Sequence, residues 1–383
     1  MTGFGFLSVG SLVVEDGASA RIAEIVRQRF VMQKVLLVTD VGLVKLGLVK
    51  PVAAALEEKG VSVTIFDQVE ADPSEMIVQQ AITAAKSCAA DVIIGFGGGS
   101  SLDVAKLVAV LAQSDQDLAD IYGLDKVQAR KVPLVQIPTT AGTGSEVTPI
   151  SIITTANDTK MGVVDRHLLA DIAILDATLT TGLPASITAA TGIDAMVHAI
   201  EAYTSAIKKN PMSDALACGA LKLLGDNIVL ACKDGSNLTA RRAMLTGAMM
   251  AGVAFTNAPV GAVHALAYPL GGRFHIPHGL SNALVLPHVL RFNALEAGDM
   301  YAELSTVIGL SGNTNETKTA AFIDWLESIA DTVGIERQLR QMRIQETDVE
   351  GLAADAMRQT RLLVNNPREV TLADARAIYE AAW

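Results

Sequence analysis

The sequence predicts two parts of different class: an α/β domain with a parallel sheet over residues 1–183, and an all-α domain over residues 184–383. The 383 residues suit about two domains, and half of them are hydrophobic, so a substantial core is available. Apolar runs in the first half alternate with helical patterns, as in parallel sheets covered by helices on both faces. After a turn-rich stretch that ends at Pro184, long segments rich in Ala, Leu and Met replace the β-branched runs.

The predicted strands of the first half are short, continuous runs of Val, Ile and Leu, which is typical of strands buried on both faces. They cover residues 34–40, 61–66, 91–96, 134–137 and 172–175. Two segments between them, 51–59 and 74–87, place apolar residues three or four apart and are predicted to be helices. Pro73 before the second segment and Glu75 in its first turn are typical of a helix N-terminus.

Four long segments of the second half also show helical spacing: residues 186–205, 213–232, 238–257 and 315–333. The stretch from Ala243 to Gly272 contains no Asp, Glu, Lys or Arg and is longer than a membrane span. It does contain Thr, Asn, Pro, His and Tyr residues, which favour helices buried inside the protein. We therefore expect no membrane-spanning segment.

Composition disfavours several classes of protein. With 30 Lys and Arg against 41 Asp and Glu, the net charge of −11 would repel nucleic acid and anionic lipid. Cys88, Cys218 and Cys232 lie far apart without C-x-x-C spacing, which disfavours a disulfide framework or a thiolate metal site. The first residues lack a basic segment followed by an apolar run, so we expect no secretory signal and a cytoplasmic protein.

A glycine-rich turn, Gly97 to Lys106, lies between a predicted strand and a predicted helix. Glycines let the main chain approach a pyrophosphate without Cβ clashes, and the free N–H groups at the helix start attract the anion. The turn lacks the third glycine of the G-x-G-x-x-G fingerprint, so the motif alone is weak evidence for a dinucleotide site. Ser100 and Asp103 resemble a capping pair at the helix start. The alternative is a plain strand-to-helix turn.

A second loop of small residues, Pro138 to Glu146, also follows a predicted strand. Its hydroxyl and N–H groups could hold a phosphate, a ribose or a carboxamide. In an open parallel sheet, ligands bind beyond the carboxyl ends of the strands, where both loops would lie. Asp40 ends an earlier strand and could accept hydrogen bonds from a ribose, which would disfavour a 2′-phosphate. The alternative for Asp40 is a turn aspartate.

Histidines gather in the second half of the chain. Asp194 and His198 are one helical turn apart within an apolar segment, where an unpaired carboxylate would be costly to bury. A divalent metal ion would remove that cost. Together with His264 and His278, one carboxylate and three imidazoles can converge on such an ion. A donor set without thiolates suits Fe²⁺, Co²⁺ or Zn²⁺, and the sequence does not choose among them.

These four motifs, in this order along the chain, resemble those of the iron-containing (group III) alcohol dehydrogenases over essentially the whole length. The resemblance implies a Rossmann-like N-terminal domain that binds NAD and a helical C-terminal domain that binds metal and carries out catalysis. It implies that Fe²⁺, or Zn²⁺ or another divalent metal in its place, is held in the cleft by the four residues Asp194, His198, His264 and His278.

The resemblance also assigns cofactor contacts. Asp40 would contact the adenosine ribose, and Asp72 stands where many members have Asn, so a ribose contact is expected there as well. Gly98, Gly99 and Ser100 would contact the pyrophosphate. The remaining positions that match are Thr139, Thr140 and Thr143 on the adenine and phosphate side, with Lys160 and Leu179.

The sequence departs from the family pattern at Tyr268. Many members carry a histidine four residues after the third metal ligand, and this histidine is thought to relay protons. A phenol, with an ordinary pKa of about 10, is a poor proton relay at neutral pH. His275, three residues before His278, is the candidate replacement, with a loop histidine as the alternative. The predicted catalytic residues are His275 and Tyr268.

The expected activity is metal-dependent and NAD(H)-linked interconversion of a primary alcohol, or a small hydroxy compound, and its aldehyde. A hydroxyacid–oxoacid transhydrogenase or a 4-hydroxybutyrate-type dehydrogenase is the near alternative, because Arg273 and Lys160 could bind a carboxylate. A dehydroquinate synthase-like lyase is a more remote alternative. Such an enzyme binds a phosphorylated sugar acid and needs many cations, but few lie near the histidine motifs. We expect a small-molecule substrate as partner, no nucleic acid and no membrane. The oligomeric state stays open, and a homo-oligomer such as a dimer is compatible with the sequence.

Overall fold

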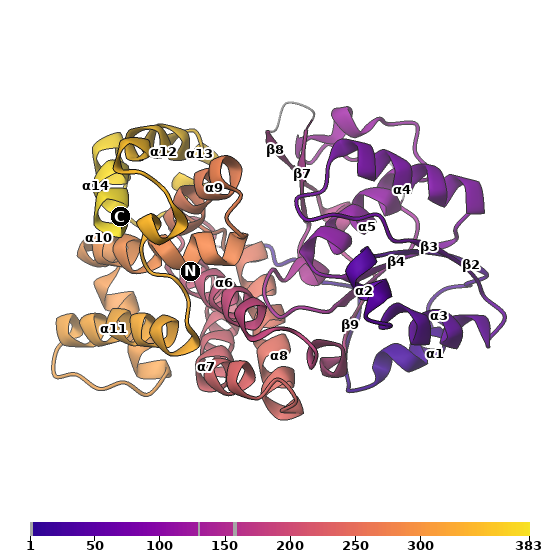
Figure 1. Cartoon of the computed structure of the whole chain (residues 1–383), viewed down its shortest axis with the longest axis horizontal. Coiled ribbons are helices and arrows are strands. Elements are labelled where there is room, and N and C mark those ends of the chain that lie inside the picture. Colours follow the sequence, from indigo (N-terminus) through magenta and orange to yellow (C-terminus); the bar gives the residue numbers. More distant parts are fainter. Residues whose placement is uncertain (1–2, 129–130, 156–158) are drawn as a thin grey trace. The chain divides into compact units, whose positions relative to one another are not determined.

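The computed structural model describes residues 3–128, 131–155 and 159–383. Its internal contacts group the chain into two compact units, drawn in Figure 1. The α/β unit consists of Leu7–Thr140 and Gly144–Thr181. The helical unit consists of Gly182–Trp383, the short segment Ala141–Thr143 and the segment that ends at Phe6. That each unit is a separate domain, with a boundary at residues 183 and 184, stays a prediction.

A six-stranded parallel sheet forms the centre of the α/β unit, with the strand order β1-β9-β6-β4-β2-β3. The five predicted strands are confirmed. The edge strand β1 was not predicted, because its three residues are too few to show a pattern. The strands are β1 (Leu12–Val14), β2 (Lys34–Val38), β3 (Ser62–Phe66), β4 (Val92–Gly97), β6 (Leu134–Pro138) and β9 (Ile172–Leu175).

Helices cover both faces of this sheet because successive strand residues point to opposite faces. Leu36 and Val38 of β2 pack in one core, to which α4 and α5 contribute, whereas Val35 and Leu37 pack in a second core with α1 and α3. The two predicted helices are confirmed, with ends that differ by one or two residues. The helices are α1 (Ile22–Arg27), α2 (Val41–Lys45), α3 (Val49–Glu57), α4 (Glu75–Cys88) and α5 (Gly99–Leu111).

The α/β unit also contains a small three-stranded sheet that the sequence did not predict. Strands β7 (Ile150–Thr154) and β8 (Lys160–Val164) pair antiparallel, and β5 (Gly123–Leu124) pairs with β8. Ser, Thr, Lys and Gly residues interrupt the apolar pattern of β7 and β8, which hides both strands from a search for continuous apolar runs.

The predicted capping pair at the start of α5 is wrong. The N-cap residue is Gly98, and among the described residues no side chain caps the helix. The carboxylate of Asp103 instead accepts hydrogen bonds from Ser145 Oγ at 2.6 Å and from the Ile152 amide at 2.9 Å. Its two oxygens are therefore engaged by partners that are distant in sequence, and the first-turn N–H groups of α5 keep no side-chain acceptor.

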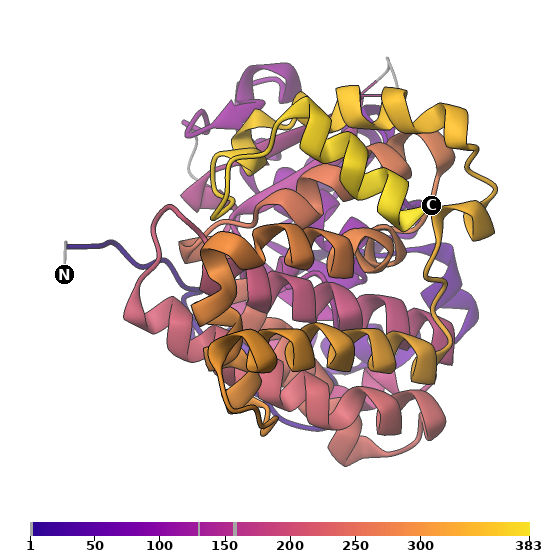
Figure 2. The same ribbon diagram turned by 90° about the vertical axis from the view of Figure 1, so that its left-hand side faces the viewer.

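Figure 2 looks onto the helical unit, in which long helices lie side by side. The four predicted helices are confirmed, two of them with the predicted ends. Asn210, Asn237 and Thr314 cap three of these helices with their side chains, as helix-forming sequences commonly do. The helices are α6 (Ala185–Thr204), α7 (Pro211–Lys233), α8 (Leu238–Asn257), α9 (Ala262–Phe274), α10 (His278–Val307), α11 (Asn315–Val333), α12 (Val349–Met357), α13 (Thr360–Leu363) and α14 (Leu372–Ala382).

Short 3₁₀ helices complete both units. Those of the α/β unit are η1 (Ala18–Arg21), η2 (Leu118–Ile121), η3 (Ser145–Val147), η4 (Arg166–Leu168) and η5 (Ala177–Thr180). Those of the helical unit are η6 (Leu339–Met342) and η7 (Glu346–Asp348). Of these, η3 and η5 follow the strands β6 and β9 at the carboxyl edge of the sheet.

The uncharged stretch from Ala243 to Gly272 forms most of α8 and α9, and most of its residues are buried. This confirms the prediction of buried helices. By length and composition alone, α7 could cross a membrane, and α8 and α9 together pass the same test although a bend of 107° separates them. Core helices of soluble proteins pass this test too, so length and composition do not decide the question.

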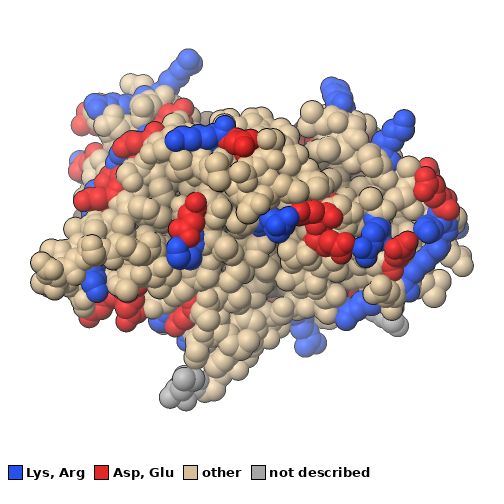
Figure 3. Space-filling model, turned by 90° about the horizontal axis from the view of Figure 1, so that it is seen from below, with Lys and Arg blue, Asp and Glu red and all other residues tan. Residues whose placement is uncertain are grey.

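Charged side chains of both signs are interspersed on the face drawn in Figure 3. The chain also has exposed ion pairs between near neighbours, such as Lys222 with Asp226 and Arg376 with Glu380. Exposed pairs of this kind contribute about 0–1 kcal/mol each to stability. The fold therefore depends on its buried apolar cores and buried polar contacts, rather than on these surface charges.

Candidate metal centre and cofactor site

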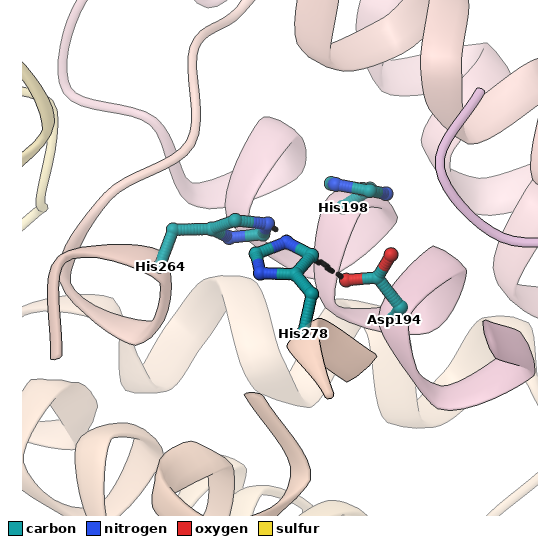
Figure 4. A group of neighbouring side chains, drawn as sticks. All are labelled: Asp194, His198, His264 and His278. Carbon is teal, nitrogen blue, oxygen red and sulfur yellow. Dashed lines mark ion pairs between the residues drawn. The ribbon is translucent and has the colours of Figure 1, made fainter. Parts of the chain in front are cut away.

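The four predicted metal ligands converge within the helical unit (Figure 4). One ligand atom from each side chain lies within 4.8 Å of the other three. Asp194 and His198 lie one turn apart on α6, His264 lies in the first turn of α9, and His278 is the first residue of α10. The Asp194 Oδ1 atom lies 3.5 Å from Nε2 of His278 and 4.0 Å from Nε2 of His264. The structure therefore brings all four side chains together.

A glycine lets the start of α10 approach α6 closely. An added Cβ at Gly279 would lie only 2.2 Å from the main-chain oxygen of Ala190 and 3.3 Å from Cβ of Asp194. Any larger residue at this position would push the two helices apart. Because His278 is the preceding residue, the spacing between its imidazole and Asp194 depends on this contact.

The charge state of the cluster fits a divalent cation. Burial lowers the pKa of His198 to about 3, so its imidazole is neutral at neutral pH. Burial opposes ionisation of Asp194, but the neighbouring imidazoles and the amide of Asn282 lower its pKa below the usual value. The His198 Nδ1 atom is buried without a hydrogen-bond partner in the part of the chain that the structure describes. A buried carboxylate beside imidazole nitrogens is the donor set that a divalent metal ion stabilises.

Glu201 is a buried acidic residue at this cluster that sequence analysis missed. Its Oε2 atom accepts a hydrogen bond from Nδ1 of His264 at 2.6 Å. The Nε2 atom of His264 is thereby left to face Asp194. The sequence did contain a signal that could have identified Glu201. It is a second acidic residue in the apolar helical segment, three positions after His198 and therefore on the same helical face.

Asn282 is the second residue that was missed. Its amide donates to Oδ1 of Asp194 at 2.6 Å and lies 3.4 Å from Nε2 of both His264 and His278. The spacing of four residues from His278 places both side chains on one face of α10. This buried amide therefore lines the space where the ligand atoms meet.

Aromatic rings surround the cluster. Phe255 stacks on His198 with ring centroids 4.3 Å apart, and the ring of Tyr268 lies 5.9 Å from that of His278. His275 ends α9 in a left-handed conformation with φ 54°, and its side chain is exposed. Within the described ranges, His275 is not among the side chains that form the cluster of ligand atoms. The catalytic roles of Tyr268 and His275 stay predictions.

The glycine-rich turn forms at the carboxyl end of β4. Gly97 has φ 153°, and an added Cβ would lie 2.7 Å from Oγ of Ser101, so this position requires glycine. At Gly98 an added Cβ would fit without a clash, because its nearest neighbour would be the Thr140 methyl group at 3.7 Å, an ordinary van der Waals contact. Gly99 and Ser100 follow in the uncapped first turn of α5. The three predicted pyrophosphate contacts thus lie at a helix start with room beside the main chain.

The second predicted cofactor loop starts beside the first one. The Thr139 amide donates to the Gly97 main-chain oxygen at 2.9 Å, and Thr140 lies beside Gly98. The structure therefore brings the two loops together at the ends of β4 and β6, as their positions after two strands predicted. Thr143 belongs to the short segment that groups with the helical unit.

Two further predicted cofactor residues follow β2 and β9 at the same edge of the sheet. Asp40 is the N-cap of α2, and its Oδ1 atom accepts from the Leu43 amide at 3.0 Å. This is a turn-forming role, and it uses one of the two carboxylate oxygens. Leu179 lies in η5 and is buried in the core of the α/β unit. Contacts of both residues with a cofactor stay predictions.

The cations that could bind a carboxylate have acidic partners. Lys160 Nζ donates to Oδ1 of Asp72 at 2.5 Å, and Asp72 itself has φ 53°. Arg273 forms an ion pair with Asp355 of α12. A negatively charged substrate would therefore have to compete with a carboxylate that is already in place at either position.

The chain matches known proteins along nearly its whole length. The family model for iron-containing alcohol dehydrogenase matches residues 10–177, and the model for the C-terminal part of the Fe-containing alcohol dehydrogenase family matches residues 188–383. Long-chain-alcohol dehydrogenase 1 of Geobacillus thermodenitrificans (strain NG80-2) is 42% identical over 361 residues, which are 93% of this chain and 91% of that protein.

Solved structures agree with these matches. A 1,3-propanediol oxidoreductase structure superposes with a TM-score of 0.96 at 34% identity and covers 100% of both chains. The structure of sulfoacetaldehyde reductase from Bifidobacterium kashiwanohense in complex with NAD⁺ superposes with a TM-score of 0.90 at 26% identity, covering 100% of this chain and 99% of that one. As its motifs predicted, the chain belongs to the iron-containing alcohol dehydrogenase family.

Proposed function

We propose that the protein is a metal-dependent NAD(H) alcohol dehydrogenase and aldehyde reductase that interconverts a primary alcohol, or a small hydroxy compound, and its aldehyde. The observation that carries this proposal is the convergence of one carboxylate and three imidazoles within 4.8 Å in a member of this family. The similar proteins described above include an alcohol dehydrogenase, a propanediol oxidoreductase and an NAD⁺-bound aldehyde reductase.

Divalent metal, in the first place Fe²⁺, supplies Lewis-acid polarisation of the substrate oxygen when bound, and NAD supplies the hydride acceptor. The protein holds the donor atoms for that ion. Burial keeps His198 neutral, so its lone pair is available at neutral pH. Glu201 holds Nδ1 of His264, and Asn282 holds Oδ1 of Asp194. These contacts orient the two ligands.

The α/β unit would bind the cofactor at the carboxyl edge of its sheet. The uncapped first turn of α5 offers N–H groups to a pyrophosphate, and the space beside Gly98 lets the phosphates approach the main chain. The second oxygen of the Asp40 carboxylate would accept a ribose hydroxyl. The full set of proposed cofactor residues is Asp40, Asp72, Gly98, Gly99, Ser100, Thr139, Thr140, Thr143, Lys160 and Leu179.

An uncharged substrate suits this site better than a carboxylate does. Arg273 and Lys160, the two cations that would favour a hydroxy acid, are paired with Asp355 and Asp72. If either cation bound a substrate carboxylate instead, its present ion pair would be broken. This supports a simple alcohol dehydrogenase over a hydroxyacid–oxoacid transhydrogenase or a 4-hydroxybutyrate-type dehydrogenase.

We further propose a soluble, cytoplasmic enzyme that acts on a small molecule as a homo-oligomer, most simply a dimer. The three cysteines are free thiols, which suits a reducing compartment. The edge strand β1 exposes 41% of Leu12 and 43% of Val14. An exposed apolar edge strand can pair with a second copy of the chain. Sedimentation equilibrium at several concentrations would measure the mass, and a monomer throughout would contradict the dimer.

The test is a panel of short and long aliphatic aldehydes with NADH or NADPH, after metal-free protein has been reloaded with Fe²⁺ under anaerobic conditions or with Zn²⁺. We expect NADH oxidation that depends on the added metal. Parallel reactions with an added oxoacid test the transhydrogenase, since turnover without net release of NADH would support it. No NADH oxidation with any aldehyde in fully loaded protein would contradict the proposed activity.

A further inference from the structure

The N-terminus of α9 is capped by side chains from distant parts of the sequence. Its N-cap residue, Gly261, has no side chain to accept from the first amides of the helix. The Ala262 amide instead donates to Oδ1 of Asn366 at 3.3 Å, and the Val263 amide donates to Oε1 of Glu201 at 2.7 Å. These acceptors lie 104 and 62 residues away in sequence. The helix start that carries His264 is therefore fixed by tertiary contacts.

The Glu201 carboxylate holds both the main chain and the imidazole at this helix start. Its Oε1 atom accepts from the Val263 amide, while its Oε2 atom accepts from Nδ1 of His264 at 2.6 Å. The residue is 5% exposed, so solvent does not compete for either oxygen. Helix α6 thus supplies two ligands, Asp194 and His198, and also sets the position and ring orientation of a third.

Asn366 links the same helix start to α10, whose first residue is His278. Its amide exchanges two hydrogen bonds with the amide of Asn293 on α10, at 2.9 and 2.7 Å. Both side chains are buried. The packing is close, because an added Cβ at Gly261 would lie 3.2 Å from Cα of Asn366. The segment after α13 therefore joins the two helices that carry His264 and His278.

We propose that Glu201 and Asn366 are positioning residues that fix His264 for metal binding before the ion arrives. The inference rests on the metal site proposed above. A ligating histidine that donates its other N–H to a carboxylate has a fixed tautomer, and loss of such a partner typically weakens metal binding about 10- to 100-fold. Asn366 acts one step further away, because it holds the main chain of Ala262 rather than the ring itself.

The test measures the affinity of metal-free protein for Zn²⁺ by competition with a chromophoric chelator. Glu201→Gln keeps the shape but replaces one acceptor oxygen with an N–H donor, so the side chain can no longer accept from both the Val263 amide and the Nδ1–H group of His264. The His264 ring then loses its preference for the Nδ1–H tautomer, which leaves Nε2 free for a metal ion. We expect the dissociation constant of this variant to rise about 10- to 100-fold. For Asn366→Ala we expect a rise of about threefold to tenfold, the effect of one hydrogen bond.

Glu303→Gln is the matched control. Glu303 also accepts a hydrogen bond from α6, from the Tyr203 hydroxyl at 2.6 Å, but this contact is exposed and does not involve the cluster. We expect its Zn²⁺ affinity to equal that of the parent within twofold. Urea unfolding of each metal-free variant is measured in parallel, so that a change in affinity is read only from protein that is folded.

A second readout needs no metal. Long-range nitrogen–proton spectra of histidine-labelled, metal-free protein should show His264 with its proton on Nδ1 in the parent, and a mixture of tautomers in Glu201→Gln. A merely structural role would lower the unfolding midpoint but leave both the tautomer and the Zn²⁺ affinity of folded protein unchanged. Should Glu201→Gln not fold, Glu201→Asp, which keeps the charge but shortens the reach, replaces it in both measurements.

The outcomes separate this inference from the proposed function. Parent protein that binds one equivalent of Zn²⁺, with both variants binding within twofold of it, overturns the positioning role alone. Parent protein that binds no stoichiometric Zn²⁺ overturns the metal site and the positioning role with it. Weaker binding by both variants, with Glu303→Gln unchanged, supports the inference.

Discussion

The ammonium group of Lys106 donates to the Ser145 hydroxyl at 2.8 Å, although the Lys106 side chain is completely buried. The same group contacts Oδ1 of Asp103 at 3.3 Å, the Thr148 hydroxyl at 3.1 Å and the Ile150 main-chain oxygen at 2.6 Å. One buried cation thus joins α5, which begins at the glycine-rich turn, to η3 in the second loop. Both proposed cofactor loops depend on this contact for their relative position.

Lys106→Met should destabilise the protein by about 3–5 kcal/mol, because it leaves the Asp103 carboxylate without its cation inside the α/β unit. It should also raise the KM for NADH, since the two loops lose their shared contact. Urea unfolding and steady-state kinetics measure the two effects. Lys222→Met removes an exposed pair and is the control, with an expected change of less than about 1 kcal/mol. Equal unfolding midpoints for Lys106→Met and the parent would contradict the prediction.

His278→Ala should remove bound metal and abolish turnover, because one of four donors is lost. NADH binding should persist, since all the proposed cofactor residues except Thr143 belong to the other unit. Elemental analysis measures the metal, and quenching of protein fluorescence measures NADH binding. His167→Ala, in η4 beside Asp165, is the matched histidine control. Full metal content and activity in His278→Ala would show that the site is assigned wrongly.

The sequence allowed prediction of features that depend on local spacing. Asp194 and His198 share a helical face because they are four residues apart, and the strands of the large sheet are continuous apolar runs. The meeting of His264 and His278 with that pair was expected from their donor chemistry and was also implied by the family resemblance, and the structure brings the four residues together. Sequence spacing alone does not show that His264 and His278 lie near Asp194 and His198, because the two histidines belong to two other helices.

Features that depend on distant contacts could not be predicted in this way. Glu201 and Asn366 act on residues 62 and 104 positions away, and no local pattern marks them as caps of α9. The predicted cap at Ser100 and Asp103 failed for the same reason. Local spacing favours that pair, but Asp103 gains other partners in the Ser145 hydroxyl and the Ile152 amide, which become neighbours only after folding.

Asp40→Gly should narrow the preference for NADH over NADPH by about 1–3 kcal/mol, the range for one hydrogen bond to a charged group. The carboxylate would repel a 2′-phosphate on the ribose. Values of kcat/KM for both cofactors in parent and variant give the change. Because Asp40 also caps α2, Asp40→Ser is the control that keeps an N-cap without the charge. Equal use of both cofactors by the parent would contradict the proposed contact.

His288 should make stability depend on pH in the acidic range. Burial, followed by the nearby Arg291 and Arg337, lowers the pKa of His288 to about 4 from an ordinary value of about 6.5. The unfolded chain therefore binds more protons between these values, so this stability is fully present above pH 6.5 and is lost as the pH falls towards 4.

His288→Gln should therefore lose less unfolding free energy than the parent between pH 7 and pH 4.5, by up to about 3 kcal/mol. Urea unfolding of metal-free protein at both pH values measures this difference, and the comparison cancels contributions from the histidines of the metal cluster. Between pH 7 and pH 8 the two proteins should change in parallel. Identical pH profiles over the whole range would contradict the assigned shift.

The proton path is the remaining prediction, and it depends on Tyr268 and His275. Tyr268 lies one turn after His264 on α9, with its ring 5.9 Å from that of His278, whereas His275 ends the helix with an exposed side chain. Histidine is the side chain that commonly changes charge between pH 5 and 8, so a relay through His275 would leave a pH-dependent mark on the rate.

We expect His275→Ala to lower kcat for alcohol oxidation about tenfold or more and to flatten the rise in rate between about pH 6 and 8. Tyr268→Phe should change mainly KM, because it removes a hydroxyl beside the site but no proton carrier that is effective at neutral pH. Metal content must be measured in both variants, since loss of the ion would imitate loss of a relay. If His275→Ala keeps the parent's pH profile at full metal occupancy, the proton must leave through water or a ribose hydroxyl, and His275 has no part in the reaction.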